Sequence, residues 1–227
     1  MERRHFPFGA IYFWLMVFFL YVPLLLLVVL SFNDSISLSF PLEGFTLKWY
    51  DKVVRNEIMM DALKNSALMS VVSSLGATLL GTMAALAVAW YRFPGRNFFI
   101  GLATAPLVIP YVIAGVALLV ALNWMGVPLS LWTVGLGEMV INLPLAMLIV
   151  LGAVIGFDQS LEEASMDLGA SYLKTQVLVT LPIIAPSLVA AFITCVVASF
   201  NEFAMAFFLI GAEPIIPTYL FSQLRNT

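Results

Sequence analysis

The sequence predicts an all-α polytopic membrane protein, and three observations carry this prediction. Hydrophobic residues make up 62% of the 227 residues, and charged residues make up only 10%. The apolar residues form continuous runs of membrane-spanning length, unlike the alternating strands of an outer-membrane barrel. One charged segment, residues 158–182, lies between two of these runs and therefore has to lie in water.

Five apolar runs are long enough to cross the hydrocarbon core of a bilayer. In chain order the expected spans are residues 11–30, 65–89, 98–122, 131–157 and 183–209. Residues 33–64 form a polar connection, and residues 211–227 are expected to form a polar tail. We therefore expect a single transmembrane domain over residues 1–227.

Two spans carry local signals. The second span has a small residue at every fourth position, which lets another helix approach closely; these are Ser73, Ala77, Gly81, Ala85 and Ala89. The third span contains Pro106 and Pro110. Two prolines at this spacing free backbone carbonyls, which the membrane tolerates only against protein or a wet cavity.

Several functions are disfavoured by what the sequence lacks. It has no phosphate-binding loop of the G-x-x-x-x-G-K-[ST] type, so the chain is not expected to hydrolyse ATP itself. The net charge of −3, without a basic cluster, gives no reason to expect a nucleic-acid partner. The single cysteine, Cys195, lies inside a span and is expected to be a buried thiol. No cofactor, metal site or catalytic residue is expected.

The segment 158–182 has the pattern helix, turn, helix. Ser160 and Glu163 are spaced as a capping box, and Leu161, Ala164, Ser165 and Leu168 then form one small, apolar face opposite an acidic one. Gly169 is the residue expected where a helix ends in the left-handed conformation. Ser171 is expected to cap a second helix, and Pro182 to start the next span.

This segment resembles a known motif. Glu163-Ala164-Ser165-x-x-x-Gly169, followed after nine residues by Val179-x-Leu181-Pro182, is similar to the "EAA" loop of ABC-importer permeases. Ser165 and Val179 stand where Ala and Ile are usual, and both keep the volume small. Residues 44–50, with Trp49, resemble the stretch after the first helix of spermidine/putrescine-type permeases. The coupling residues that the resemblance implies are Leu161, Glu163, Ala164, Leu168, Gly169, Leu181 and Pro182.

The resemblance implies a type-I ABC-importer permease fold in the bacterial inner membrane, in which the EAA loop fits a groove of an ATPase. The implied partners are a second permease subunit, two ABC ATPase subunits and a solute-binding protein, and the implied mechanism is alternating access. This chain would be a non-catalytic subunit. The family has a sixth helix, and its sequences run past Thr227, so we expect that helix to be missing.

Orientation is predicted from the positions of basic residues. An N-terminus on the cytoplasmic side places five Lys and Arg residues on each side of the membrane. Arg3, Arg4, Arg92 and Arg96 crowd the ends of spans, where positive charge favours the inside. A cytoplasmic N-terminus also places residues 158–182 in the cytoplasm.

Glu202 is the candidate for a substrate-facing group. Its predicted place inside the fifth span makes a carboxylate costly unless it faces water, a partner or a substrate. A structural role, bonded to Asn142 or a hydroxyl, is an equal alternative, and Glu138 is expected to reach the membrane interface. The expected substrate path is completed by Ser199, Asn201, Tyr111 and Trp49, although Trp49 also fits an ordinary interface anchor.

The resemblance bears on the solute. Spermidine/putrescine-type permeases carry Ser-x-Asp-Asp where this chain has Ser199-Phe200-Asn201-Glu202, and an Asp where this chain has Tyr111. With fewer carboxylates to pair with ammonium groups, a polyamine, an opine, an amino-acid-like amine and a zwitterion all stay open. Two other classes are alternatives, namely an ion-coupled secondary transporter using Glu202 and a structural membrane subunit. An ion-coupled transporter would leave the hairpin unexplained, and a structural subunit would leave Glu202 without a function.

Overall fold

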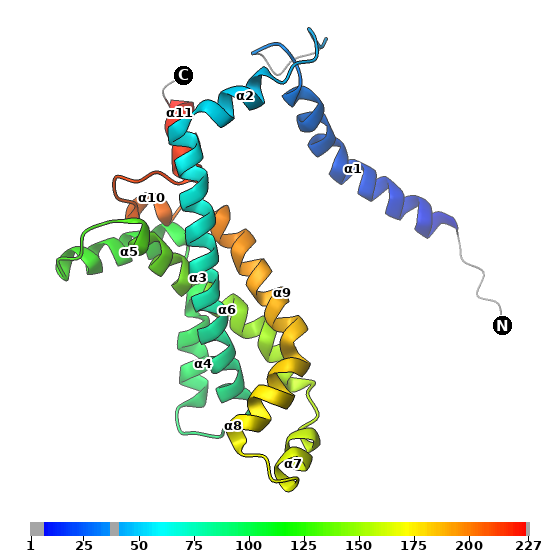
Figure 1. Ribbon diagram of the computed structural model, residues 1–227, viewed down its shortest axis with the longest axis vertical. Helices are drawn as coiled ribbons and strands as arrows, with labels where there is room; N and C mark the ends of the chain where they lie inside the picture. Colours follow the sequence, from blue (N-terminus) through cyan, green and yellow to red (C-terminus); the bar gives the residue numbers. More distant parts are fainter. Residues whose placement is uncertain (1–6, 37–40, 226–227) are drawn as a thin grey trace. The chain divides into compact units, whose positions relative to one another are not determined.

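The computed structural model describes residues 7–36 and 41–225, which are helical over most of their length (Figure 1). These residues divide into two compact units, Met1–Met60 and Asp61–Thr227, and each is described by itself. The expectation of one transmembrane domain over the whole chain stays a prediction. The all-α fold class is confirmed, because the described residues contain no strand beyond one isolated bridge, Asn33 with Phe45.

The first unit consists of one long apolar helix, α1 (Pro7–Ser31), and a short amphipathic helix, α2 (Lys48–Arg55). Between them the chain folds back on itself. The indole Nε1 of Trp49 donates to the backbone oxygen of Asn33 over 2.7 Å, and the Asn33 side chain accepts the N–H of Glu43 over 2.9 Å. These bonds join the start of α2 to the segment that follows α1.

The remaining helices belong to the second unit, except that α3 begins four residues before it, in the last residues of the first unit (Figure 1). In chain order they are α3 (Glu57–Trp90), α4 (Arg96–Thr104), η1 (Ala105–Leu107), α5 (Tyr111–Trp124), α6 (Leu131–Ile155), α7 (Ser160–Asp167), α8 (Tyr172–Thr175), η2 (Gln176–Thr180), α9 (Leu181–Phe200), α10 (Ala206–Leu209) and α11 (Ile216–Arg225). Here η1 is a turn of 3-10 helix and η2 is a π-helical turn that makes α8 to α9 one continuous rod.

The described residues contain four single helices that are long and apolar enough to span a membrane, within α1, α3, α6 and the rod Tyr172–Phe200. These correspond to four of the five predicted spans. The predicted third span is different, because α4 with η1 and α5 are bent by 105° with respect to each other. Pro106 lies inside η1 and Pro110 caps α5, so the two prolines mark the break.

Two boundaries were predicted wrongly. The fifth span was expected to run to residue 209, but α9 ends at Phe200 and the chain turns before α10 begins at Ala206. Residues 211–227 were expected to be a polar tail, but α11 forms within them. Asn65 on α3 donates to the backbone oxygen of Pro214, and Ser66 accepts the N–H of Ile216, which fixes the start of α11 against α3.

The second unit has two apolar core clusters. One joins α3, α6 and α9 and contains Ala85, Met147, Val150 and Ala191; the other joins α3, α5, α6 and α10 and contains Met69, Leu122, Val134 and Met205. The small-residue stripe of α3 faces this core, since Ser73, Ala77, Gly81 and Ala85 are all buried. The prediction that this stripe serves close helix packing is confirmed.

Gly81 makes the closest approach between α3 and α6. A Cβ atom at this position would lie 2.8 Å from the backbone nitrogen of Met147 and 2.9 Å from the Cβ of Ala146. The backbone of α6 cannot give way as a flexible side chain would, so even one methyl group would separate the two helices.

Replacing Gly81 by Ala is therefore expected to destabilise the protein by about 1–3 kcal/mol, although alanine is the better helix former. Gly101→Ala is the matched control, because a Cβ atom there meets nothing within 4 Å. Thermal unfolding of both variants in the same detergent checks this. Equal melting temperatures for the two variants would contradict the close approach.

Candidate functional site

The segment 158–182 forms the predicted hairpin, but its first helix begins differently from the prediction. The expected capping box of Ser160 and Glu163 is wrong, because Gln159 is the N-cap of α7 and its side chain makes no capping bond. Asp158 instead accepts the backbone N–H of Ser160 over 3.0 Å. The Ser160 hydroxyl and this N–H stabilise the charged form and hold the pKa of Asp158 below its usual range.

The end of α7 is as predicted. Gly169 has a φ of +91°, the left-handed conformation that glycine adopts without a steric cost. Its N–H donates to Met166 over 2.9 Å, and the N–H of Ala170 donates to Ser165 over 3.1 Å. This is the Schellman pattern, which satisfies the last carbonyls of a helix and turns the chain sharply. The second helix begins at the expected N-cap, Ser171, whose hydroxyl makes no capping bond.

The two arms of the hairpin are joined by buried polar contacts. The Glu162 carboxylate, which is 8% exposed, accepts hydrogen bonds from Gln176 over 2.9 Å and from the hydroxyl of Thr180. The hydroxyls of Ser165 and Thr175 lie 3.1 Å apart. Because hydrogen bonds to a charged group are the strong ones, Glu162 holds α7 against the π-helical turn η2.

Glu162 was missed as a functional residue from the sequence, where it counted only as part of an acidic face. Gln176 and Thr180 were the available signal, since they are polar residues one turn apart at the start of an apolar rod. A second, exposed contact joins the hairpin to the residue that follows α3. The hydroxyls of Tyr172 and of Tyr91, which follows α3, lie 2.9 Å apart.

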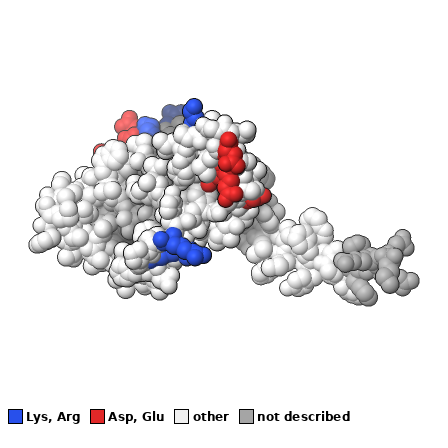
Figure 2. All heavy atoms as spheres, turned by 90° about the horizontal axis from the view of Figure 1, so that it is seen from below, with Lys and Arg blue, Asp and Glu red and all other residues white. Residues whose placement is uncertain are grey.

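The outer face of the hairpin carries the residues expected to couple. Leu161 is 45% exposed and Leu168 is 90% exposed, and Glu163, Ala164 and Gly169 are exposed beside them. Leu181 is half-buried where η2 meets α9, and Pro182 is exposed one residue later. Seen from the end of the molecule where α7 and α8 lie in Figure 1, the surface is mostly uncharged, with a few separate groups of acidic and basic residues (Figure 2).

The centre of the helical unit contains a buried carboxylate that the sequence misplaced. Glu138 was expected to reach the membrane interface, but it is 3% exposed in α6. Its Oε2 accepts hydrogen bonds from the hydroxyl of Ser73 on α3, over 3.1 Å, and from the hydroxyl of Ser199 on α9. The two hydroxyls also lie 3.1 Å apart. One carboxylate thus joins three helices.

Glu202 is also buried, at 6% exposed, but it does not lie within a span. Its two oxygens accept the backbone N–H groups of Met205 and Ala206 over 2.8 and 2.9 Å. The carboxylate therefore caps α10, where a negative charge is favourable. The expectation that Glu202 lies inside the fifth span is wrong because α9 ends at Phe200.

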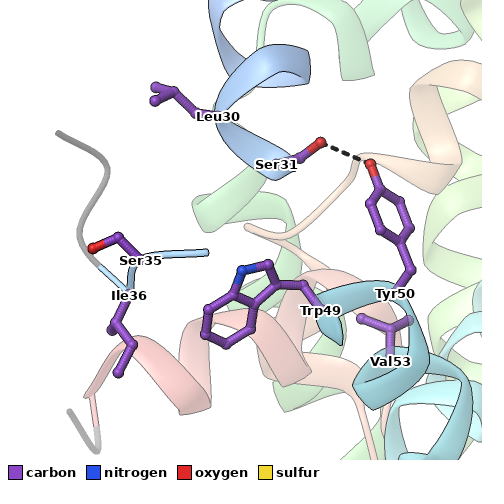
Figure 3. Close-up of a pocket in the computed structure, with 7 residues that line it drawn as sticks. All are labelled: Leu30, Ser31, Ser35, Ile36, Trp49, Tyr50 and Val53. Atoms are coloured by element: carbon purple, nitrogen blue, oxygen red, sulfur yellow. Dashed lines mark hydrogen bonds between the residues drawn. The ribbon is translucent and has the colours of Figure 1, made fainter. Parts of the chain in front are cut away.

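The other residues expected on the substrate path are distributed over both units. Asn201 is exposed, and its amide donates to the backbone oxygen of Val197. Tyr111, 41% exposed, is the first residue of α5, and one turn later Gly115 approaches Met205. Trp49 belongs to the first unit, where it lines a groove between the end of α1 and α2 (Figure 3).

Comparison with known proteins identifies the chain. Residues 77–226 match the family model described as the binding-protein-dependent transport system inner membrane component. The chain belongs to this family. It is 30% identical to the spermidine/putrescine transport system permease protein PotC of Escherichia coli strain K12, over 91% of this chain and 78% of that protein. It is 33% identical to the putrescine transport system permease protein PotI of the same strain, over 91% and 76%.

Solved structures share the fold. A crystal structure of a bacterial ABC transporter involved in the import of the acidic polysaccharide alginate matches 95% of this chain and 78% of that one, with a TM-score of 0.71 and 17% identity. A second structure of a bacterial alginate ABC transporter, in complex with an alginate pentasaccharide-bound periplasmic protein, matches with a TM-score of 0.69 and 18% identity. At this identity the likeness concerns the fold alone.

Membership in this family establishes the general function of the chain. The chain is a multi-pass inner-membrane permease subunit of an ABC importer, which works with a solute-binding protein and an ATPase and does not itself hydrolyse ATP. The matched residues include the whole hairpin, Glu138 and Ser199.

The Glu162 contacts generate a prediction about the hairpin of this permease. Glu162→Gln removes the charged acceptor that Gln176 and Thr180 share, at an expected cost of about 1.5–3 kcal/mol. Backbone amides of residues 160–175 should then exchange about 10- to 100-fold faster in hydrogen–deuterium exchange. Glu163→Gln is the matched control, because the neighbouring carboxylate is exposed. Equal exchange in the two variants would show that Glu162 does not hold the hairpin.

The three-helix contact at Glu138 generates a second prediction. Ser73→Ala or Ser199→Ala leaves the carboxylate with one hydroxyl donor, whereas the double variant leaves it with neither. We expect each single change to cost about 1 kcal/mol and the double change to exceed their sum by about 1–3 kcal/mol, the penalty of a buried group without a partner. Thermal unfolding of the four proteins of this cycle provides the measurement. Strict additivity would mean that the two serines do not share one acceptor.

Proposed function

We propose that this permease subunit passes a small amine-bearing solute, a polyamine, an opine or an amino-acid-like molecule, across the inner membrane by alternating access. In this proposal the hairpin 158–182 docks on the ATPase, and the N-terminus lies in the cytoplasm. The complex contains a second permease subunit, two ATPase subunits and a solute-binding protein. The single observation that carries the proposal is an exposed apolar face on a hairpin that is tied to a membrane-spanning rod.

The outer face of α7 supports docking. Leu161, Ala164 and Leu168 are one turn apart along one side of the helix, and all three are exposed. Exposed leucines on a water-facing helix mark an interaction surface rather than a free one. Gly169 shapes this surface, because its left-handed turn ends the helix directly after Leu168.

The inner face of α7 supports transmission of force. Glu162 and Ser165 bond to Gln176, Thr180 and Thr175, which all lie on the rod that continues into α9. A movement of α7 would therefore be transmitted to α9 through direct side-chain hydrogen bonds rather than through a flexible loop. Leu181 and Pro182 stand where this rod leaves the hairpin.

The polar interior supports a solute path along α3, α6 and α9. Near the contact of Glu138 with Ser73 and Ser199, three further polar atoms are buried without a hydrogen-bond partner in the part of the chain that the structure describes; these are Ser74 Oγ, Thr78 Oγ1 and Asn142 Nδ2. Buried unpaired polar groups are costly, and membrane helices retain them where water or substrate passes. In another state of the transport cycle this strip would line the path.

The choice of an amine-bearing solute rests on two supports. Relatives at 30% and 33% identity are named for transport of spermidine and putrescine, or of putrescine. Glu202 and Glu138 supply carboxylates in the same unit, and a carboxylate is the natural partner of an ammonium group. Asn201 and Tyr111, at the end of α9 and the start of α5, belong to the same unit. The expectation that Trp49 also lines the path stays a prediction.

The experiment that tests the docking proposal replaces Leu168 by Asp in the complete complex. Leu168 is 90% exposed, so the change should leave the fold intact while placing a charge in the apolar docking face. We expect a tagged permease to lose at least 10-fold of the co-purified ATPase, and ATP-driven uptake of labelled putrescine into proteoliposomes to fall with it.

Leu47→Asp is the matched control, because Leu47 is 66% exposed in the first unit and outside any span. It should retain both ATPase and uptake. Unchanged co-purification in the Leu168 variant would refute docking at α7. Uptake that is competed by no amine, in the wild-type complex with its binding protein, would refute the proposed class of solute while leaving the docking result intact.

A further inference from the structure

A groove in the first unit lies where α1 meets α2 (Figure 3). Its volume is about 470 Å³, which is within the range of ligand-binding pockets. The lining comes from the last turn of α1, the segment after it and one side of α2, and consists of Leu30, Ser31, Ser35, Ile36, Trp49, Tyr50 and Val53. The hydroxyls of Ser31 and Tyr50 lie 2.7 Å apart and join the two helices at one side of the groove.

The groove lies at the depth of lipid headgroups. Helix α1 has 25 residues and is therefore about 38 Å long, more than the roughly 30 Å of the hydrocarbon core. Its last turn, which lines the groove, thus emerges at the polar boundary. Trp49 and Tyr50 are the residue types enriched at this boundary, and α2 presents them beside lysines.

Of the basic residues of α2, Lys52 is the one that makes no ion pair within the described part of the chain. Lys48 pairs with Asp34, and Arg55 pairs with Asp51. Lys52 has no carboxylate partner among residues 7–36 and 41–225, and its ammonium group lies 4.8 Å from the centre of the Trp49 ring. An exposed ammonium group above an indole, at the rim of an apolar groove, is suited to a phosphate with an attached hydrocarbon chain.

The groove is continuous with an apolar surface of α1. Within the first unit, as far as it is described, no residue of the apolar window in α1 is buried. We propose that the groove binds an anionic phospholipid, with its phosphate at Lys52 and Trp49 and one acyl chain between Ile36, Leu30 and Val53, continuing along α1. The bound lipid would hold α2 in the membrane surface and fix the exit of α1.

Native mass spectrometry of the purified permease–ATPase complex tests this proposal. The complex is delipidated and then titrated with phosphatidylglycerol or with phosphatidylcholine, which share the phosphate and the acyl chains but differ in net charge. We expect a preference for phosphatidylglycerol that Lys52→Glu lowers by about fivefold or more, since one lysine near an anionic surface contributes about 1 kcal/mol. Lys64→Glu is the matched control, because Lys64 is an exposed lysine outside the groove.

A second measurement identifies the occupant directly. A benzophenone amino acid at position 36, which is 91% exposed on the groove wall, is photo-crosslinked in vesicles that contain phosphatidylglycerol. A lipid adduct that Lys52→Gln reduces supports the proposal. Crosslinking to the second permease subunit, equal loss of lipid in the Lys52 and Lys64 variants, or retention of free inorganic phosphate instead of lipid would overturn it. None of these readouts depends on transport, so the proposal stands or fails independently of the proposed function.

Discussion

The contact of Glu138 with Ser73 and Ser199 is the constraint that organises the helical unit. A carboxylate in the membrane interior is costly unless it is bonded, and here its partners come from the second and fifth predicted spans while it belongs to the fourth. On α3 and in the segment of α9 the serine falls between the two apolar core clusters, and Glu138 lies among the α6 residues of the second cluster. The apolar clusters can hold helices together in many registers, because dispersion contacts are not directional. The shared carboxylate favours one register, and in that register Gly81 of α3 lies against Met147 and Ala146 of α6.

The contact of Ser199 with Glu138 also explains how the hairpin and the interior of the unit can move together. Ser199 lies one residue before α9 ends at Phe200, and Glu162 bonds to the other end of the same rod at Gln176 and Thr180. A single helical rod therefore carries a polar attachment at each end, one to the water-facing hairpin and one to the interior of the unit. The π-helical turn at residues 176–180 lies at the hairpin attachment. Turns of this kind interrupt the regular bonding of a helix and are frequent at functional sites.

The sequence predicted the membrane class, four of the spans, the hairpin and its left-handed glycine, because each follows from composition or local spacing. Gly169 could be located since few residues other than glycine end a helix in that way. The capping box of α7 and the place of Glu202 were wrong because of local contacts of the chain, whereas other errors concern tertiary partners. Glu138 was placed at an interface because the sequence does not state which buried group lies opposite a carboxylate. Glu162 was overlooked for the same reason. The end of α9 could not be predicted, because the apolar run in the sequence continues to residue 209. In the structure the carboxylate of Glu202 stabilises the start of a new helix at Ala206.

Glu138 and Glu202 are both buried carboxylates, but their hydrogen bonds depend differently on the positions of the helices. Glu202 is satisfied by two backbone N–H groups of its own chain segment, so its bonds would survive a movement between helices. Glu138 is satisfied only by side chains of two other helices, so its bonds would be lost if α3 and α9 moved apart. Such a movement would expose a carboxylate that needs new partners, and an ammonium group or water would supply them. Of the two, Glu138 is therefore the group whose environment depends on the conformation of the transporter, and the buried, unpaired Asn142 amide and Ser74 hydroxyl lie on two of the same three helices.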